Sequence, residues 1–333
     1  MTSLKSKKTS IAVLGGGSWG TALVKILVDN GHEVHWYIRN IDVIESIKRE
    51  GRNPNYLSQF SVNTEKIQLS SNLYEVVRSS PHLLLAIPAA FIGPVLNEIG
   101  TVLQSKIILS AVKGIVPDTQ LVVGQHLEYL KVPKNQIGVI GGPSHAEEVA
   151  REKRSYLTIA FPQKKLASLW ANRLACEYIH TKVSKDVTGI EYAAMLKNIY
   201  ALAAGIASGL EYGDNFNSVL LSNAVREMKR FLRGVYGKKR NINHSAYLGD
   251  LLVTAFSNYS RNRNFGVHIG KGYTVKETQA ILKMVAEGYY AVESAVKINN
   301  GRAKIPIIES VYEILYKKGV PDAIFSELSQ ELR

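Results

Sequence analysis

The sequence is poor in cysteine, and its apolar runs are short. Cys176 is the only cysteine among 333 residues, so an internal disulfide and a cysteine-rich metal site are both excluded. This scarcity fits a reducing compartment. The longest uncharged apolar stretch, LLLAIPAAFIGPVL (83–96), contains two prolines and is too short to cross a bilayer. The basic start MTSLKSKKTS lacks the apolar region of a secretory signal. We therefore expect a cytoplasmic protein with no integral membrane segment.

Acidic residues are scarce relative to basic ones, since 28 Asp and Glu against 41 Lys and Arg give a net charge of +13. Such a balance can indicate nucleic acid, an acidic membrane surface or small anionic ligands as partners. The densest basic stretch, 226–240, has helical spacing in its first half, which is typical of a solvated helix face. Aromatic residues are not interleaved as stacking platforms, so we expect no nucleic acid partner. We also expect no metal site, because His145, His180 and His244 lack metal-ligand spacing to a cysteine or carboxylate.

What the sequence does contain, in its first half, is an alternation of short apolar runs and amphipathic segments. Strands are predicted at 10–14, 33–38, 67–70, 82–87, 106–111, 137–141, 156–161 and 178–183. Amphipathic helical segments are predicted between several of them, at 18–30, 41–50 and 117–130. Because the strands are almost wholly apolar, the pattern predicts an α/β fold with a doubly wound, mostly parallel sheet.

The second half is predicted to be all-α, because strand signals stop after about residue 186. Helices are predicted at 186–208, 216–234, 245–257, 274–298 and 305–318, with glycine or proline in the gaps. We therefore expect two domains, at 1–186 and 187–333.

The most informative segment is IAVLGGGSWG at 11–20, an apolar run that ends in glycines before an amphipathic segment. Gly15, Gly17 and Gly20 occupy the three glycine places of G-x-G-x-x-G. In order, these places permit a tight turn, a close approach of backbone to a pyrophosphate, and close helix–strand packing. The helix N-terminus that follows supplies amide donors and a positive dipole end. In this context the pattern predicts a dinucleotide site, with a plain strand–helix turn as the alternative.

The end of the second predicted strand bears on which dinucleotide is bound. A fold that prefers NAD usually carries Asp or Glu there, about 20 residues past the glycines, to bind the ribose 2′-hydroxyl. This sequence has Arg39 and Asn40 instead. A planar cation suits a 2′-phosphate, which favours NADP, although a surface arginine without a ligand is the alternative and NAD stays open.

Two lysines stand in places where chemistry is possible. Lys113 ends the apolar strand of ILSAVKGI, and ligands of open α/β sheets lie beyond the carboxyl ends of strands. Lys197 lies on a helical stripe of small apolar residues, namely Ile190, Ala193, Ala194, Ala201 and Ala204. Burial would make its ammonium costly unless it is partnered or its pKa falls, and a lysine with a lowered pKa can act as an acid or base. Solvation of either side chain is the alternative.

Further polar residues follow in two segments. Asp250 and Thr254 are one helical turn apart, so both can address one point. Ser260, Arg261 and Asn262, with Arg263 and Asn264, are predicted to form a donor-rich loop that can hold a phosphate.

An earlier segment, GGPSHAE (141–147), is predicted to be a strand end followed by a helix start. Ser144 and Glu147 have the spacing of a capping box, which accounts for both of them structurally. A helix N-terminus is also an anion site, and the two interpretations are compatible.

Taken in order, these segments resemble the NAD(P)-dependent glycerol-3-phosphate dehydrogenase family of bacterial type. The resemblance covers essentially the whole chain. Its motifs are GGGSWGTAL, AVKG, GGPSHAEE, AAMLKN, LGDLLVT, SRNRNFG and VAEGYYAVE. It implies a Rossmann-type domain, a helical substrate domain, and the interconversion of dihydroxyacetone phosphate and sn-glycerol 3-phosphate for phospholipid synthesis. It also implies a homodimer.

The resemblance assigns roles position by position. Lys197 matches the catalytic proton acceptor, and Lys113 matches a lysine that contacts both cofactor and substrate. Substrate contacts are implied at Gly142, Ser144, Asp250, Ser260, Arg261 and Asn262, and further polar active-site members at Asn198 and Thr254. Dinucleotide contacts are implied at Ser18, Trp19, Arg39, Ala146, Arg261, Val285 and Glu287. Departures from the family pattern occur at Tyr247 and at Ser222-Asn223.

Two rival functions remain open at this point. One is a ketopantoate or β-hydroxyacid reductase, whose substrates carry a carboxylate in place of a phosphate. The other is a sensor that binds NADP(H) without turnover.

Overall fold

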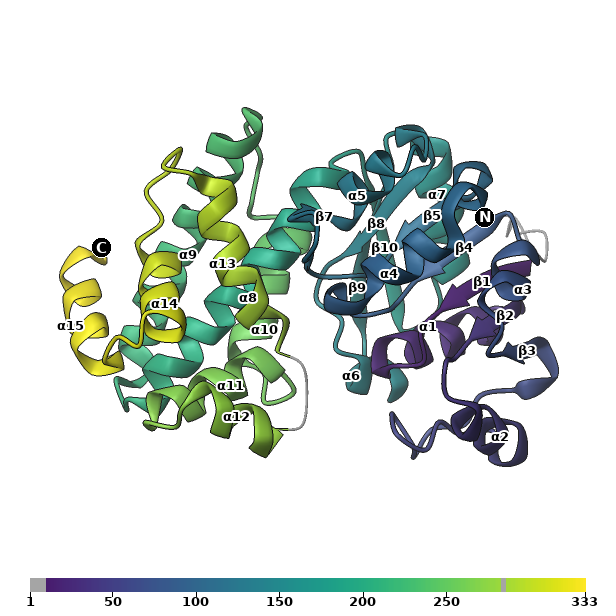
Figure 1. Ribbon diagram of the computed structural model, residues 1–333, viewed down its shortest axis with the longest axis horizontal. Helices are drawn as coiled ribbons and strands as arrows, with labels where there is room; N and C mark the ends of the chain where they lie inside the picture. Colours follow the sequence, from purple (N-terminus) through teal and green to yellow (C-terminus); the bar gives the residue numbers. More distant parts are fainter. Residues whose placement is uncertain (1–9, 283–285) are drawn as a thin grey trace. The chain divides into compact units, whose positions relative to one another are not determined.

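The computed structural model describes residues 10–282 and 286–333. The chain forms two compact units, shown in Figure 1. The sheet unit comprises the residues up to Val112 together with Leu121–Ile190, and the helical unit comprises Lys113–Gln120 with Glu191–Arg333. A domain boundary at 186/187 stays a prediction of the sequence.

The sheet unit contains one eight-stranded sheet in the order β10-β9-β8-β5-β4-β1-β2-β3. Its strands are β1 (Ser10–Leu14), β2 (Glu33–Tyr37), β3 (Ile67–Ser70), β4 (His82–Leu85), β5 (Ile107–Ser110), β8 (Ile137–Gly141), β9 (Ser155–Ala160) and β10 (Ile179–Ser184). Neighbouring strands run parallel except β8 and β9, which are antiparallel. All eight predicted strands are confirmed. The strand order reverses at the neighbouring strands β1 and β4: β2 and β3 extend the sheet on one side, and β5 and the later strands extend it on the other. Ligands of such sheets bind outside the carboxyl ends of the strands at this reversal point.

Helices cover both faces of this sheet. They are α1 (Ser18–Asp29), α2 (Ile41–Glu50), α3 (Leu73–Arg78), α4 (Ala89–Ile99), α5 (Val123–Tyr129), α6 (Ala146–Ala150) and α7 (Lys164–Leu174). Helix α1 packs with α6 and α7, whereas α4 packs with α3 and α5. The strands are apolar because both faces are buried: the consecutive residues Val13 and Leu14 of β1 point to opposite faces, and neither has exposed surface. The expected α/β, doubly wound architecture is therefore confirmed.

The predicted helical segment at 117–130 is wrong in its first half. The short strands β6 (Ile115–Val116) and β7 (Leu121–Val122) lie there instead, and the helix begins only at Val123. Pro117 follows β6, and Gln120 adopts a left-handed backbone conformation with φ 56° while its N–H donates to Val116. This tight turn interrupts the helical spacing of the side chains.

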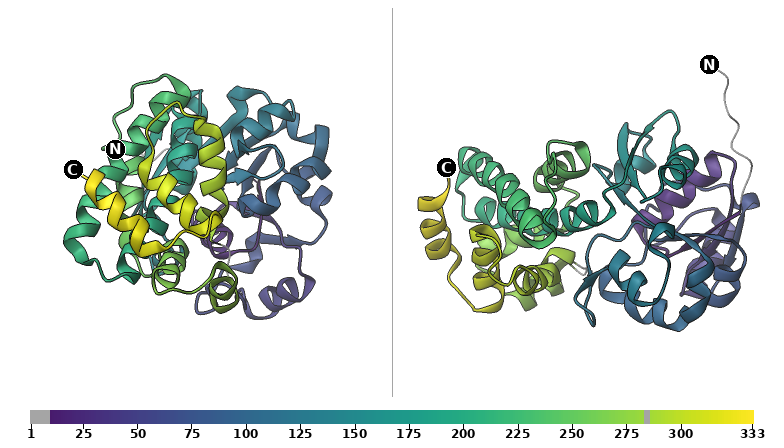
Figure 2. Two further views of the ribbon diagram at one scale, coloured as in Figure 1. Left: turned by 60° about the vertical axis from the view of Figure 1, so that its left-hand side comes forward. Right: turned by 90° about the horizontal axis from the view of Figure 1, so that it is seen from above.

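The helical unit contains no strand besides β6 among the residues that the structure describes. Its helices from α9 onward are seen in green to yellow in Figure 2. Its elements are α8 (Val187–Gly209), α9 (Gly213–Tyr236), a π-helical turn at Ser245–Gly249, α10 (Asp250–Phe256), α11 (Arg261–Gly270), α12 (Val275–Leu282), α13 (Glu287–Asn299), α14 (Pro306–Tyr316) and α15 (Pro321–Glu331). The predicted helix at 274–298 is wrong as one element, because α12 and α13 are separate. Helix α15 was missed. None of the described helices is long and apolar enough to span a membrane.

Helix α8 is the centre of the helical unit, and nearly all of its side chains from Ile190 to Ala207 are buried. It packs against α11 through facing glycines. A Cβ at Gly205 would lie 2.1 Å from the carbonyl oxygen of Arg263, and one at Gly266 would lie 2.1 Å from that of Leu202. Only glycine permits backbones this close, so the pair of helices has one tight register. The start of α11 is thereby held beside α8.

Candidate functional site

The glycine turn after β1 has the geometry that its sequence predicts. Gly15 has φ +120°, and a Cβ there would lie 2.5 Å from the carbonyl oxygen of Ala86. A Cβ at Gly20 would lie 2.2 Å from the carbonyl oxygen of Gly15, whereas one at Gly17 would meet nothing within 4 Å. Gly17 is also the N-cap of α1 and has no side chain to accept its first amides. The turn thus offers open backbone and a helix N-terminus, which fits the pyrophosphate of a dinucleotide.

A buried amide that the sequence analysis missed supports this turn. Asn53 is 1% exposed, and its Nδ2 donates to the carbonyl oxygen of Gly16 and to Oγ1 of Thr21, both at 2.9 Å. Its Oδ1 accepts hydrogen bonds from the backbone of Asn55 and Tyr56. Trp36 supports the turn from the other side, because its Nε1 donates to the carbonyl oxygen of Gly15. No local pattern predicts that Asn53 supports the glycine turn, since Gly16 and Thr21 lie more than 30 residues away in the sequence.

Arg39 lies where the second strand meets the glycine turn. The N–H of Gly15 donates to the carbonyl oxygen of Tyr37 at 3.1 Å, two residues before Arg39. Arg39 is exposed, and Asn40 caps α2 by accepting from the N–H of Asp42. The position that carries a carboxylate in NAD-preferring folds therefore carries a guanidinium here.

The segment after β8 corrects one prediction. Gly142 has φ +109°, and a Cβ at this position would clash with the carbonyl oxygen of Tyr156. The Ser144 hydroxyl donates to the carbonyl oxygen of Gly142 at 3.0 Å. Helix α6 begins at Ala146 with His145 as its N-cap. The capping box of Ser144 and Glu147 is therefore wrong, because Ser144 lies one residue too early and its hydroxyl is used in the turn.

Two lysines and one aspartate meet inside the helical unit. Lys197 of α8 is 4% exposed, and its Nζ donates to Oδ1 of Asp250, which is 1% exposed at the start of α10. Nζ of Lys113 lies 3.9 Å from Oδ2 of the same carboxylate. Burial lowers the pKa of Lys197 to about 7; Asp250 opposes this shift, and the Lys113 ammonium adds to it. An amine with this pKa can both donate and accept a proton near neutrality.

Asn198 and Thr254 lie beside this cluster and are engaged with its backbone. Nδ2 of Asn198 donates to the carbonyl oxygen of Lys113 at 3.1 Å, so it fixes the segment that carries that lysine. The Thr254 hydroxyl donates to the carbonyl oxygen of Asp250 at 2.6 Å, one turn back in α10. The hydroxyl proton of Thr254 is thus used within its own helix. A direct role of Asn198 or Thr254 in the chemistry stays a prediction.

The predicted loop at 260–264 is wrong, because these residues form the cap and first turn of α11. Ser260 is the N-cap, and its Oγ accepts from the N–H of Arg263 at 3.2 Å. The side chain of Asn262 turns inward and accepts from the N–H of Gly288 at 2.8 Å. Arg261 is half-buried between these two. A helix start next to an arginine is still an anion site, so the phosphate prediction keeps its physical basis.

The start of α13 packs against α8 and against the first turn of α11. A Cβ at Gly288 would lie 2.7 Å from the carbonyl oxygen of Asn198 and 2.9 Å from Oδ1 of Asn262. Helices α8, α11 and α13 therefore meet beside Lys197 and Arg261. Glu287 begins α13, whereas Val285 lies outside the described residues.

Comparison with known proteins agrees with this arrangement. Residues 10–167 match the N-terminal part of the NAD-dependent glycerol-3-phosphate dehydrogenase family, and residues 186–326 match the C-terminal part. A glycerol-3-phosphate dehydrogenase [NAD(P)+] of Exiguobacterium sp. is 35% identical over 94% of this chain and 92% of the relative. That of Syntrophotalea carbinolica is 32% identical over 96% and 97%.

A solved structure shows the same fold along nearly all of this chain. The crystal structure of glycerol-3-phosphate dehydrogenase (gpsA) from Coxiella burnetii has a TM-score of 0.90 at 27% identity, covering 96% of this chain and 98% of that one. The glycine turn, the buried lysine pair and the matched sequence lead to one conclusion: this chain belongs to the NAD-dependent glycerol-3-phosphate dehydrogenase family.

Proposed function

We propose that this chain interconverts dihydroxyacetone phosphate and sn-glycerol 3-phosphate, with Lys197 as the group that gives and takes the proton. The observation that carries the proposal is the buried contact of Lys197 with Asp250, which goes with a lysine pKa of about 7. The curated relatives are named for this dehydrogenase activity with NAD(P)+.

The residues of the glycine turn fit a nicotinamide dinucleotide. The open backbone at Gly17 and the start of α1 would hold the pyrophosphate, with Gly15 and Gly20 shaping the turn. Other proposed contacts are Ser18, Trp19, Arg39, Lys113, Ala146, Arg261 and Glu287. When bound, the cofactor supplies or accepts the hydride. Arg39 favours NADPH over NADH.

The lysine cluster would control charge on the reacting oxygen. Reduction of a ketone places negative charge on its oxygen, and the ammonium groups of Lys197 and Lys113 would stabilise that charge. Lys197 would then deliver its proton, and in the reverse direction its neutral amine would remove one. Asp250 contacts both lysines, so it would orient the two cations and limit their mutual repulsion.

The first turn of α11 would hold the substrate phosphate. Arg261 provides a guanidinium and the helix start provides amide donors. Asn262 contacts Gly288, and this would keep the turn in place beside α8 and α13. Gly142 and Ser144 of the sheet unit are further proposed substrate contacts.

The test follows absorbance at 340 nm while NADPH and dihydroxyacetone phosphate are incubated with the protein. Lys197→Ala should lower turnover by about 10²–10⁴-fold, because it removes the acid–base group. Binding of NADPH should stay the same, and Lys276→Ala on the exposed face of α12 is the matched control.

Three results would contradict the proposal. Near-normal turnover of Lys197→Ala would remove the assignment of the proton group. Turnover of a carboxylate substrate in place of the phosphate would identify a ketopantoate or β-hydroxyacid reductase. NADPH binding with no oxidation of any substrate would indicate a sensor.

The proposal extends to the location, the cellular role and the oligomeric state of the enzyme. We place it in the cytoplasm, because its single cysteine fits a reducing compartment. There it would supply glycerol 3-phosphate for phospholipid synthesis. We also propose a homodimer, which size-exclusion chromatography with light scattering would test.

A further inference from the structure

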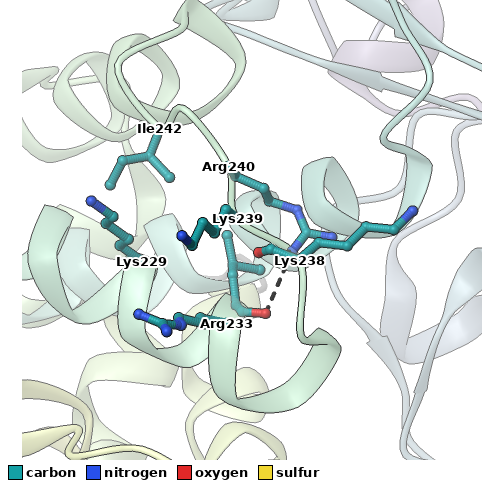
Figure 3. Close-up of a pocket in the computed structure, with 7 residues that line it drawn as sticks. Lys229, Arg233, Lys238, Lys239, Arg240 and Ile242 are labelled. Carbon is teal, nitrogen blue, oxygen red and sulfur yellow. Dashed lines mark hydrogen bonds between the residues drawn. The ribbon is translucent and has the colours of Figure 1, made fainter.

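A pocket lined by basic side chains lies at the C-terminal end of α9, in the helical unit. Its volume is about 380 Å³, within the range of small-molecule sites. We call it the basic pocket; its lining consists of Lys229, Leu232, Arg233, Lys238, Lys239, Arg240 and Ile242 (Figure 3). None of these residues belongs to the lysine cluster or to the start of α11, so the pocket is separate from the proposed active site.

The basic pocket is strongly positive, and three of its cations have no carboxylate partner among the described residues. Five of its seven lining residues are cations, and none is acidic. Within the described part of the chain, no carboxylate forms an ion pair with Lys229, Arg233 or Lys239. Glu227 is near in sequence, but it is fully buried and accepts the N–H groups of Ile307 and Ile308. Like charges held together repel one another, and an anion bound among them removes this cost.

The backbone brings these cations to one place. Lys229 and Arg233 are four residues apart on α9 and so share a helix face. Gly237 ends α9 with φ 64°, and the chain turns back there, so that residues 238–240 line the same pocket. Nη1 of Arg240 donates to the carbonyl oxygens of Leu232 and Lys238, at 3.4 and 3.3 Å, which anchors its guanidinium.

The side chains do not all point the same way. In Figure 3 the charged ends of Lys229, Arg233 and Lys239 gather on one side of the pocket, whereas Lys238 extends away from them. A group of three cations needs more negative charge than one phosphate carries at neutral pH. Leu232 and Ile242 add an apolar wall, which suits a carbon portion of a ligand.

We propose that the basic pocket binds a small soluble anion that carries two or more phosphate groups. The hollow shape favours a small molecule over a flat membrane. The two aromatic residues within 226–240, Phe231 and Tyr236, pack against Tyr192, which disfavours stacking with single-stranded nucleic acid. This would be a second anion site, independent of the substrate phosphate and of the dinucleotide.

The probe is inorganic triphosphate, titrated by calorimetry into the full-length protein saturated with NADPH. Saturation blocks the dinucleotide site, and an Arg261→Ala variant excludes binding at the start of α11. The triple variant Lys229→Ala, Arg233→Ala, Lys239→Ala should bind triphosphate at least about tenfold more weakly. The matched control is Lys164→Ala, Lys165→Ala, Lys182→Ala, which removes the same charge from exposed positions of the sheet unit and should bind like the parent protein.

The outcomes separate the possible ligands. Arg261→Ala should keep its triphosphate affinity, and raising the salt concentration should weaken binding. The proposal fails if the parent protein binds no triphosphate at millimolar concentration, or if both triple variants lose affinity equally. It also fails if vesicles of anionic phospholipid bind through the pocket while triphosphate does not, because the surface would then be a membrane contact. A single Lys239→Glu variant changes only the exposed loop after α9 and leaves the helix intact. It should also bind triphosphate more weakly than the parent protein.

Discussion

The ammonium of Lys113 lies 3.9 Å from Oδ2 of Asp250, on the carboxylate whose other oxygen accepts a hydrogen bond from Lys197. One buried carboxylate thus faces two cations, and the cluster carries one net positive charge when both lysines are protonated. A buried excess charge is costly, which is why one lysine gives up its proton at a lower pH than usual. An anionic oxygen bound beside the two lysines would offset that cost.

The pH dependence of the reaction should differ between its two directions. Because the pKa of Lys197 is lowered to about 7, the lysine is mostly protonated below that pH and mostly neutral above it. Ketone reduction needs the proton, so its kcat/KM should fall as pH rises through about 7. Oxidation needs the neutral amine, so its kcat/KM should rise over the same interval. Initial rates between pH 5.5 and 9 measure both profiles, and parallel profiles in the two directions would contradict the assignment.

Arg261→Ala should raise the KM for dihydroxyacetone phosphate by about 10–100-fold, because a charge-assisted contact to the phosphate is lost. Arg263→Ala, two residues later on the same helix, is the matched control and should change this KM little. Non-phosphorylated dihydroxyacetone gives the second readout, since its slow turnover should be the same in both variants. An unaltered KM in Arg261→Ala would remove the phosphate role.

Arg39→Asp should reverse the cofactor preference. It removes a cation from the end of β2 and places there the carboxylate that suits a ribose 2′-hydroxyl. The ratio of kcat/KM for NADPH to that for NADH should fall by about 10–100-fold. Arg154→Asp makes the same charge change at an exposed position before β9 and should leave the ratio constant. A constant ratio in both variants would show that Arg39 does not read the 2′-phosphate.

Asn53→Leu should weaken cofactor binding without removing any contact to the cofactor itself. The change deletes the hydrogen bonds to Gly16 and Thr21 and leaves buried groups unpaired, costing about 1–3 kcal/mol of unfolding free energy. A looser glycine turn should raise the KM for NADPH about tenfold and leave kcat nearly unchanged. The exposed neighbour variant Asn55→Leu should alter neither the KM nor the melting temperature. If Asn53→Leu lowers stability alone, Asn53 has no part in shaping the turn.

Two of the sequence-based predictions are wrong for the same physical reason. Ser144 and Glu147 have the spacing of a capping box, but the left-handed turn at Gly142 takes the serine hydroxyl first. The basic run at Arg261 has the composition of a loop, yet the cap at Ser260 and close packing of Gly266 on α8 stabilise a helix there. In each case a tertiary contact or a neighbouring turn outweighed a weak local preference.

The sequence by itself determined the local elements, which depend on residues close together in the chain. The strand at 10–14, the glycine turn and α1 follow from apolar periodicity and from the backbone freedom of Gly15, all within one short segment. The tertiary structure decided which distant groups meet. Asn53 reaches the turn from 37 residues away, and Asp250 reaches Lys197 from 53 residues away. The lowered pKa of Lys197 arises from burial, and burial exists only once α8 is packed on all sides.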